Sequence, residues 1–175
     1  MGNGGEMSAI YLRKPQHSDL AEIKHAYQNS IHLHQPWTYP PTDFQQYLAQ
    51  EHRYFVCLTE NHAIVGTFNI SNIIRAYFHS AYLGYEAFHP YAGHGYMRQG
   101  LQLVLHEVFQ TLNLHRLEAN IQPDNLPSIR LVAQAGFIKE GFSRQYLRVG
   151  GKEWKDHERW AILNSDWTDK KYQAF

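Results

Sequence analysis

The sequence feature that most constrains the fold is a helical stripe of apolar residues directly after the segment Gly93-His94-Gly95. The members of the stripe recur at the spacing of one helix face: Met97, Leu101, Val104, Leu105, Val108, Phe109 and Leu112. A helix that is apolar on one face has to bury that face, and strand-like segments flank it on both sides in the chain. The stripe therefore predicts a mixed α/β domain in which this helix packs on a sheet.

The other segments predict the order of the remaining elements. Alternating or apolar runs indicate strands near residues 9–13, 54–59, 63–70, 78–88 and 117–121. Helices are expected after caps at Ser18 or Asp19, after caps at Thr42 or Asp43, and from 125 to 135 with a stop at Gly136. Residues 32–41 are expected to form a loop rich in proline and aromatic residues, and residues 138–148 and 153–163 a closing hairpin.

Length and charge bound the class of protein. The chain has 175 residues, which fits one domain over residues 8–175 after a flexible leader or tag remnant at residues 1–7. Its Lys+Arg count of 16 equals its Asp+Glu count of 16, without a basic cluster, which argues against direct nucleic-acid binding. No apolar run is long enough to span a membrane and no signal peptide is recognisable, so a cytoplasmic protein is expected. The single cysteine, Cys57, excludes an internal disulfide.

The glycines before the long helix indicate a binding site for phosphate. Two glycines at a strand-to-helix turn let the backbone approach a ligand, and the first N–H groups of the helix point toward it. The segment has neither the Lys-Ser/Thr pair of a P-loop nor the third glycine of a dinucleotide-binding turn. A turn in which the glycines serve only the backbone geometry is the alternative.

Six short blocks follow one another between residues 83 and 156. They are Leu83-Gly-Tyr-Glu86, Gly93-His-Gly-Tyr-Met97, His115-Arg-Leu-Glu118, Pro123-x-Asn125-x-x-Ser128, Gly136-Phe137-x-x-Glu140-Gly141 and Gly150-x-x-x-Trp154-x-Asp156. In these blocks the sequence resembles the GNAT superfamily of acetyl-CoA-dependent N-acetyltransferases, and within it the RimJ/RimL-like group. The resemblance covers most of the chain from about Leu12 to Trp167.

The resemblance implies a fold and a cofactor site. The fold is a mostly antiparallel central sheet, flanked by helices, with splayed fourth and fifth strands and a C-terminal hairpin. Acetyl-CoA is the implied cosubstrate, with no metal. The residues implied to bind it are Ala87, Phe88, Gly93, His94, Gly95, Tyr96, Met97, Asn125 and Ser128. The chain departs from the superfamily pattern at Ala92, where Gln or Arg is usual, and at Met97, where Gly or Ala is usual.

The implied mechanism is direct attack of an amine on the thioester in a ternary complex, which needs a base, an oxyanion donor and an acid. Glu86 is the predicted base, with Glu118 as second choice and a plain strand residue as the alternative for Glu86. The backbone N–H near Ala87 is the predicted donor. Ser128 is the predicted acid and Tyr146 its rival.

The acceptor is expected to be a primary amine, foremost the N-terminal α-amine of a ribosomal protein. A small amine such as a polyamine, an aminoglycoside or an amino acid is the first alternative, and a non-catalytic acyl-CoA-binding module is the second. The pair His32-x-His34 is interpreted as part of the substrate rim rather than as metal ligands. A monomer and a homodimer both remain open.

Overall fold

The computed structural model describes residues 8–169, so the expected leader at residues 1–7 lies outside it. Seven strands form one mixed sheet in the order β1-β2-β3-β4-β5-β7-β6, which confirms the predicted fold class. The chain divides into two compact units, one formed by residues 8–69 and 85–103 and the other by residues 70–84 and 104–169. Each unit thus combines two separate stretches of sequence, and the single domain expected over residues 8–175 stays a prediction.

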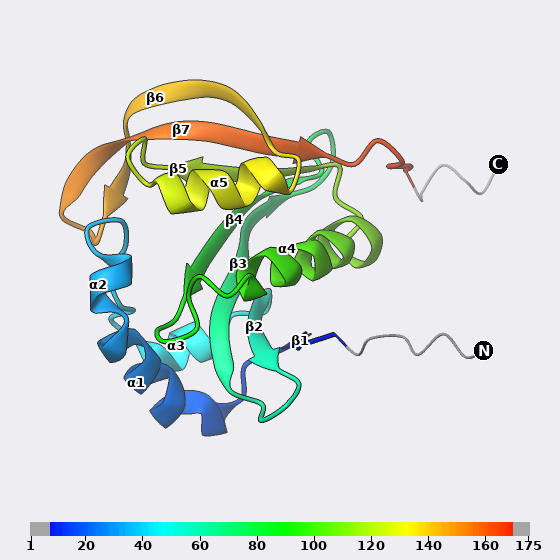
Figure 1. The fold of residues 1–175 in the computed structure, drawn as a ribbon. Helices are drawn as coiled ribbons and strands as arrows, with labels where there is room; N and C mark the ends of the chain where they lie inside the picture. Colours follow the sequence, from blue (N-terminus) through cyan, green and yellow to red (C-terminus); the bar gives the residue numbers. More distant parts are fainter. Residues whose placement is uncertain (1–7, 170–175) are drawn as a thin grey trace, which may run out of the picture. The chain divides into compact units, whose positions relative to one another are not determined.

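The strands and helices follow the predicted order (Figure 1). The strands are β1 Ile10–Arg13, β2 Arg53–Leu58, β3 Ile64–Ile74, β4 Ser80–Ala87, β5 Arg116–Ile121, β6 Ile138–Val149 and β7 Glu153–Leu163. The helices are η1 His17–Asp19, α1 Leu20–Asn29, α2 Ile31–His34, α3 Phe44–Leu48, α4 Tyr96–His106, η2 Glu107–Thr111 and α5 Leu126–Gln134. Among residues 8–169, no helix is long and apolar enough to cross a membrane.

In the first unit, β2 is the central strand and pairs antiparallel with β1 and with β3. All six residues of β2 are buried, because helices cover both faces of this part of the sheet. Phe55 and Cys57 lie in a core cluster with Ile23 and Tyr27 of α1. Val56, which points to the opposite face by strand alternation, lies 3.0 Å from the Cβ position of Gly100 in α4.

Helix α4 approaches the sheet closely because each side of the contact has a glycine, Gly100 in α4 and Gly66 in β3. A Cβ atom at Gly66 of β3 would lie only 2.2 Å from Sδ of Met97 and 3.0 Å from the Glu86 carbonyl oxygen. Gly66 therefore makes room for the methionine that stands in place of the usual small residue. The first turn of α4 is fixed to β3 through this contact.

The second unit begins with a parallel pair, in which Ser80, Ala81 and Tyr82 of β4 lie opposite Arg116, Leu117 and Glu118 of β5. Strand β7 pairs antiparallel with β5 on one side and with β6 on the other. The predicted hairpin turn is confirmed, with positive φ at Gly150 and Gly151. Figure 1 shows α5 running beside β5, and this helix ends at a glycine, Gly136, with φ of 97°.

Three local expectations are wrong or incomplete. The segment 32–41 does not form a loop throughout, because His32 and His34 belong to the single helical turn α2. The Asp19 carboxylate does not cap α1; it accepts hydrogen bonds from Arg13 and from the Gln16 N–H instead. The long helix changes to π geometry at Glu107–Thr111 before it ends.

Candidate active site

The glycine turn lies in the first unit at the start of α4 and has the geometry of an anion cradle. Gly93 and Gly95 have φ of 85° and 81°, and a Cβ atom at either position would meet nothing within 4 Å. The first bond of the helix runs from the Gln99 N–H to the Gly95 carbonyl, so the N–H groups before Gln99 have no acceptor within the helix. The His94 and Tyr96 rings stack beside the turn with centroids 5.7 Å apart. The turn thus fits a phosphate-bearing ligand.

The strand end that leads to this turn is held by residues of the α1–α2 segment. The His34 Nε2 donates to the Ala87 carbonyl at 2.8 Å, and the His89 N–H donates to the Ser30 hydroxyl at 2.9 Å. The Phe88 N–H donates to the Val65 carbonyl at 2.9 Å, and the Phe88 carbonyl accepts from the Tyr91 and Ala92 N–H groups. Phe88 could pair with pantetheine only by leaving these partners, so its predicted role stays a prediction.

Ala87 differs from Phe88 in the direction of its backbone groups. In a strand the N–H and carbonyl of one residue point to the same side, and the next residue points to the other. The Phe88 N–H bonds to Val65 of β3, so the Ala87 N–H faces away from β3. It lies on the same side of the strand as the Ala87 carbonyl, which accepts from His34. The role of the Ala87 N–H as the oxyanion donor stays a prediction.

A pocket of about 230 Å³ lies in the first unit next to this strand end. It is smaller than the pockets of about 300–1,000 Å³ that hold drug-sized ligands, so its size fits a single residue or a small amine. Two of its residues carry carboxylates, Asp43 and Glu86, and one carries a guanidinium, Arg53. The lining residues are Tyr27, Tyr39, Pro41, Thr42, Asp43, Gln46, Tyr47, Gln50, Arg53 and Glu86.

Glu86 is half-buried in the wall of this pocket. Burial raises its pKa above the usual range for a carboxyl group. Three groups act in the opposite direction and lower the pKa of Glu86 in part. They are the Arg53 guanidinium through its charge, His34 through its electrostatic interaction, and Tyr27 through a hydrogen bond. A carboxylate with a raised pKa is a better proton acceptor near neutral pH, which suits Glu86 for the role of base.

Two buried tyrosines of the pocket, Tyr27 and Tyr47, are neutral hydrogen-bonding groups. Burial raises the pKa of both Tyr27 and Tyr47, so both hydroxyls keep their protons. Their oxygens lie 3.3 Å apart, and the two rings meet edge to face with centroids 5.7 Å apart. Asp43 caps α3, because one of its oxygens accepts from the N–H groups of Gln45 and Gln46 at 2.8 and 3.0 Å.

Sequence reasoning missed Arg53, although the sequence contains a signal for it. Arg53 opens the strand Arg-Tyr-Phe-Val-Cys-Leu, whose remaining residues are apolar or aromatic, and it is only 6% exposed. A charged residue in a fully buried strand needs a structural or functional partner. The pocket itself was not predictable, because its walls come from segments far apart in the chain.

The remaining predicted site residues lie in the second unit. The Asn125 side chain caps α5 by accepting from the Ser128 N–H at 3.4 Å. Tyr146 is half-buried, hydrogen bonds with Tyr82 and lies 6.3 Å from the His157 ring. The cofactor role of Asn125 and the acid role of Ser128 or Tyr146 therefore stay predictions.

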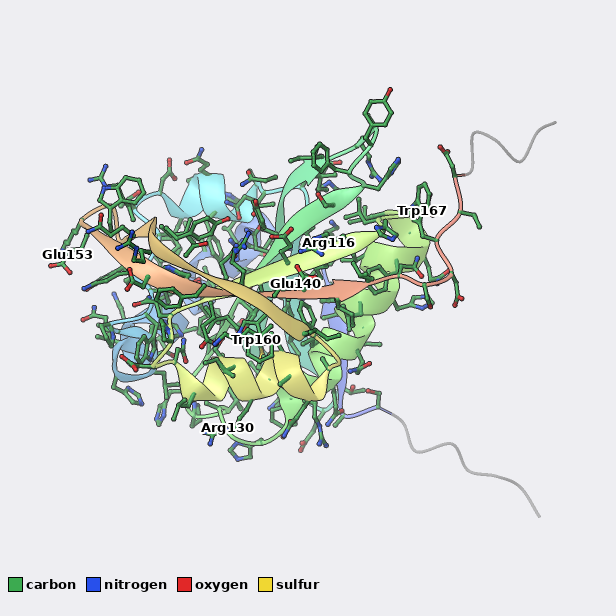
Figure 2. The ribbon with its side chains drawn as sticks, turned by 90° about the horizontal axis from the view of Figure 1, so that it is seen from above. Arg116, Arg130, Glu140, Glu153, Trp160 and Trp167 are labelled. Atoms are coloured by element: carbon green, nitrogen blue, oxygen red, sulfur yellow. The ribbon has the colours of Figure 1, made fainter. Side chains whose placement is uncertain are left out.

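Glu118, the second choice for the base, is already paired in the second unit. Its Oε1 accepts from Arg116 Nε at 2.7 Å, and Arg116 also bonds Glu140 (Figure 2). Unlike Glu86, Glu118 does not line the pocket of the first unit, and its Oε1 is engaged by the Arg116 guanidinium. Within residues 8–169, no group of three or more His, Cys, Asp or Glu side chains is placed to hold a metal ion.

Comparison with known protein families gives one match over most of the chain. The model of the acetyltransferase (GNAT) domain matches residues 9–138. The probable N-acetyltransferase YjcK of Bacillus subtilis is 35% identical over 127 residues, which are 71% of this chain and 70% of that protein. The [ribosomal protein uS5]-alanine N-acetyltransferase of Escherichia coli is 39% identical over 105 residues, 60% of this chain. The match spans about half of the length of the latter relative, 54%.

Solved structures show the same fold. Ribosomal-protein-S5-alanine acetyltransferase from Vibrio fischeri superposes with a TM-score of 0.83 at 29% identity, covering 94% of this chain and 98% of that one. Mycobacterium smegmatis RimJ in complex with CoA-disulfide gives 0.80 at 25% identity, covering 91% and 84%. Spermidine N-acetyltransferase from Vibrio cholerae, in complex with CoA and spermine, shares the fold with a TM-score of 0.74 at 20% identity, covering 92% and 99%.

Proposed function

The chain belongs to the GNAT acetyltransferase family, and from that premise we propose that its acceptor is the N-terminal α-amine of a protein, of the ribosomal kind. The chain is an N-acetyltransferase by family, and GNAT acetyltransferases use acetyl-CoA. The observation that carries the proposal is Glu86, a carboxyl group with a raised pKa in a small pocket directly before Ala87. The E. coli relative, named for acetylating an alanine of uS5, supports this acceptor.

The strength of the base favours an α-amine over a lysine side chain. An α-amine has a pKa of about 7.7–8.0 and a lysine about 10.4, so the neutral form at pH 7 costs about 1 kcal/mol for the former and about 4.5 kcal/mol for the latter. A carboxylate therefore accepts a proton from an α-ammonium group far more readily than from a lysine ammonium group. Glu86 therefore suffices for an N-terminus without a stronger base.

The residues divide the reaction between them. Glu86 accepts the proton of the ammonium group, and the freed nitrogen forms a bond to the acetyl carbonyl carbon. The Ala87 N–H donates to the carbonyl oxygen as negative charge develops there. The carbon–sulfur bond breaks, and the thiolate takes a proton, for which Ser128 and Tyr146 remain the predicted donors. The nitrogen releases its second proton as the amide forms, and that proton restores the donor. The N–H groups of Gly95, Tyr96 and Met97 bind the pyrophosphate of acetyl-CoA, as the open turn permits.

A small polyamine is the second candidate acceptor. The observation in its favour is Asp43, a second carboxylate in the wall that already contains Glu86, since two negative charges suit a ligand with two ammonium groups. The two candidates differ in what surrounds the attacked nitrogen. An N-terminal amine has a peptide carbonyl beside it, whereas a polyamine has only methylene groups.

The test is an acetylation assay with a peptide that has both a free N-terminus and an internal lysine, with spermidine in a parallel reaction. Release of CoA measures turnover, and mass spectrometry of the peptide fragments locates the acetyl group. We expect the acetyl group on the α-amine. Acetylation of spermidine with an untouched peptide would overturn the proposal in favour of the second candidate, and acetylation of the lysine would overturn it as well.

A further inference from the structure

We propose that Arg53 recognises the carbonyl oxygen next to the attacked amine, so that the pocket selects α-amino acyl acceptors and discriminates against alkyl amines. This inference rests on the proposed function and names the chemistry that defines its acceptor. Glu86 takes the ammonium group and Arg53 the adjoining carbonyl, and both residues line the same pocket of the first unit.

Three neighbouring side chains hold the Arg53 guanidinium. Its Nε donates to Gln50 Oε1 at 2.7 Å, and one terminal nitrogen donates to Thr67 Oγ1 at 3.0 Å. The guanidinium carbon lies 3.8 Å from the centre of the Tyr47 ring, at the distance of a cation–π contact. All three partners are uncharged, so they orient the guanidinium without neutralising it.

The guanidinium also has hydrogen-bonding capacity left. It has five N–H groups, and the bonds to Gln50 and Thr67 use two of them. Arg53 forms no ion pair within the part of the chain that the structure describes, in contrast to Arg13, whose nitrogens bond Asp19 at 2.7 and 2.8 Å. Arg53 and Glu86 interact electrostatically across the pocket without a direct ion pair, so the remaining N–H groups of the buried guanidinium still need an oxygen acceptor. The pocket that Arg53 lines provides the place for that oxygen.

The charges around the pocket fit an acceptor with this pattern. Glu86 and Asp43 contribute carboxyl oxygens and Arg53 contributes N–H donors, so the pocket offers acceptors for an ammonium group and donors for an oxygen. The carbonyl of an N-terminal residue is neutral but has a strong dipole, and it can accept from Arg53 while the ammonium donates to Glu86. An alkyl amine would leave the Arg53 donors unpaired and desolvated, which is the situation in which a polar site rejects an analogue.

The experiment compares two small acceptors of similar size, alaninamide and sec-butylamine, which differ in whether a carbonyl adjoins the amine-bearing carbon. CoA release gives kcat and KM, expressed per unprotonated amine so that the different amine pKa values do not enter. The wild-type enzyme is expected to favour alaninamide in kcat/KM. Arg53→Met is expected to lower that preference by about 10- to 100-fold, because hydrogen bonds of a charged donor have about that strength.

Two further variants separate recognition from folding. Arg53→Lys keeps the charge and loses the planar fork, so it should retain part of the preference. Lys24→Met removes an exposed cation of α1 and should leave the preference unchanged. Turnover of sec-butylamine by Arg53→Met, together with an unchanged melting-temperature rise on adding acetyl-CoA, shows that the variant is folded. If Arg53→Met does not fold, the comparison is made between the wild-type enzyme and Arg53→Lys. A lower ratio of kcat/KM for alaninamide to that for sec-butylamine in Arg53→Lys then supports the role of Arg53, and an equal ratio overturns it.

The outcomes distinguish the inference from the proposed function. An unchanged preference in Arg53→Met, with peptide N-termini still acetylated, overturns the role of Arg53 alone. A wild-type enzyme that turns over sec-butylamine or spermidine but neither alaninamide nor peptides overturns the proposed function and this inference together. A collapse of the preference through KM for alaninamide, with kcat for sec-butylamine unchanged, supports the inference.

Discussion

Arg53 and Arg116 are each the first residue of a strand, but they meet different partners. Arg116, in the second unit, bonds two carboxylates, Glu118 at 2.7 Å and Glu140 (Figure 2). Arg53, in the first unit, bonds the neutral groups of Gln50 and Thr67, has no ion pair among residues 8–169 and lines a pocket. The difference teaches how to separate a structural cation from one available for a ligand: the former has its anions within the fold, and the latter has hydrogen-bonding capacity left for a group from outside.

Glu86 and Glu118 show the same contrast, because Glu86 lines a pocket and Glu118 is paired with Arg116 within the fold. The largest expected effect tests this contrast. Glu86→Gln should lower kcat by about 10²- to 10⁴-fold, because general base catalysis contributes about that much. Acetyl-CoA should still raise the melting temperature, since the cradle is intact. Steady-state CoA release on an N-terminal peptide is the measurement, with Glu51→Gln, an exposed carboxylate at 86% side-chain exposure, as the matched control. A loss of this size in Glu118→Gln, with Glu86→Gln active, would reverse the assignment.

The next effect concerns two glycines. Gly66 of β3 lies against Met97, whereas a Cβ atom at Gly84 of β4 would meet nothing within 4 Å. Gly66→Ala should lower the free energy of unfolding by about 1–3 kcal/mol through overpacking, and it should weaken acetyl-CoA binding, because the first turn of α4 is displaced. Gly84→Ala is the control and should change stability little. Urea denaturation measures both, and the double variant Gly66→Ala/Met97→Ala should recover part of the loss.

A smaller effect is expected from Arg116→Met. Removing the guanidinium leaves Glu118 and Glu140 without their partner, which should lower the free energy of unfolding by about 1–2 kcal/mol. Selectivity between alaninamide and sec-butylamine should not change, because Arg116 pairs within the fold. Altered selectivity in Arg116→Met would contradict the distinction between the two arginines.

The smallest effect is a difference in pH dependence between Glu86 and Glu140. Burial raises the pKa of Glu86 in the folded state, so its contribution favours folding below its unfolded pKa, about 4.3, and is lost as the pH rises through the folded value. A hydrogen bond from Arg116 lowers the pKa of Glu140, so its contribution is present above the unfolded value and is lost as the pH falls through the folded one. Melting curves between pH 3 and 8 should therefore show that Glu86→Gln and Glu140→Gln change the slope in opposite directions.

Much of the fold could be predicted because hydrophobic periodicity is local. The stripe from Met97 to Leu112, the helix stop at Gly136 and the hairpin at Gly150-Gly151 all depend on neighbours in sequence. The turn α2 was not predicted, because Pro36 and the aromatic residues around it are typical of a loop and hid the single helical turn before them. Asp19 was expected to cap a helix, but the pairing with Arg13 across six positions took precedence.

The parts of the candidate site that depend on local sequence patterns were predicted, and the parts that depend on tertiary contacts were not. The glycine turn and Glu86 belong to short motifs, whereas the pocket combines residues from α1, α3, β2 and β4. No local pattern places Tyr27 beside Tyr47, or Arg53 in the wall that contains Glu86. The accommodation of Met97 by Gly66 is likewise tertiary, because 31 positions separate the two residues.

The interleaving of the two units has a consequence for cutting or inserting into the chain. A break between residues 69 and 70 severs β3, and a break between 103 and 104 severs α4, and both units contain part of each element, so fragments from such a break should not fold as independent bodies. The exposed turn at Gly150-Gly151 joins the two strands of the terminal hairpin, so a break there affects the second unit only. It is the position at which a reporter sequence or a split site would leave the acceptor pocket and the glycine turn in one continuous fragment.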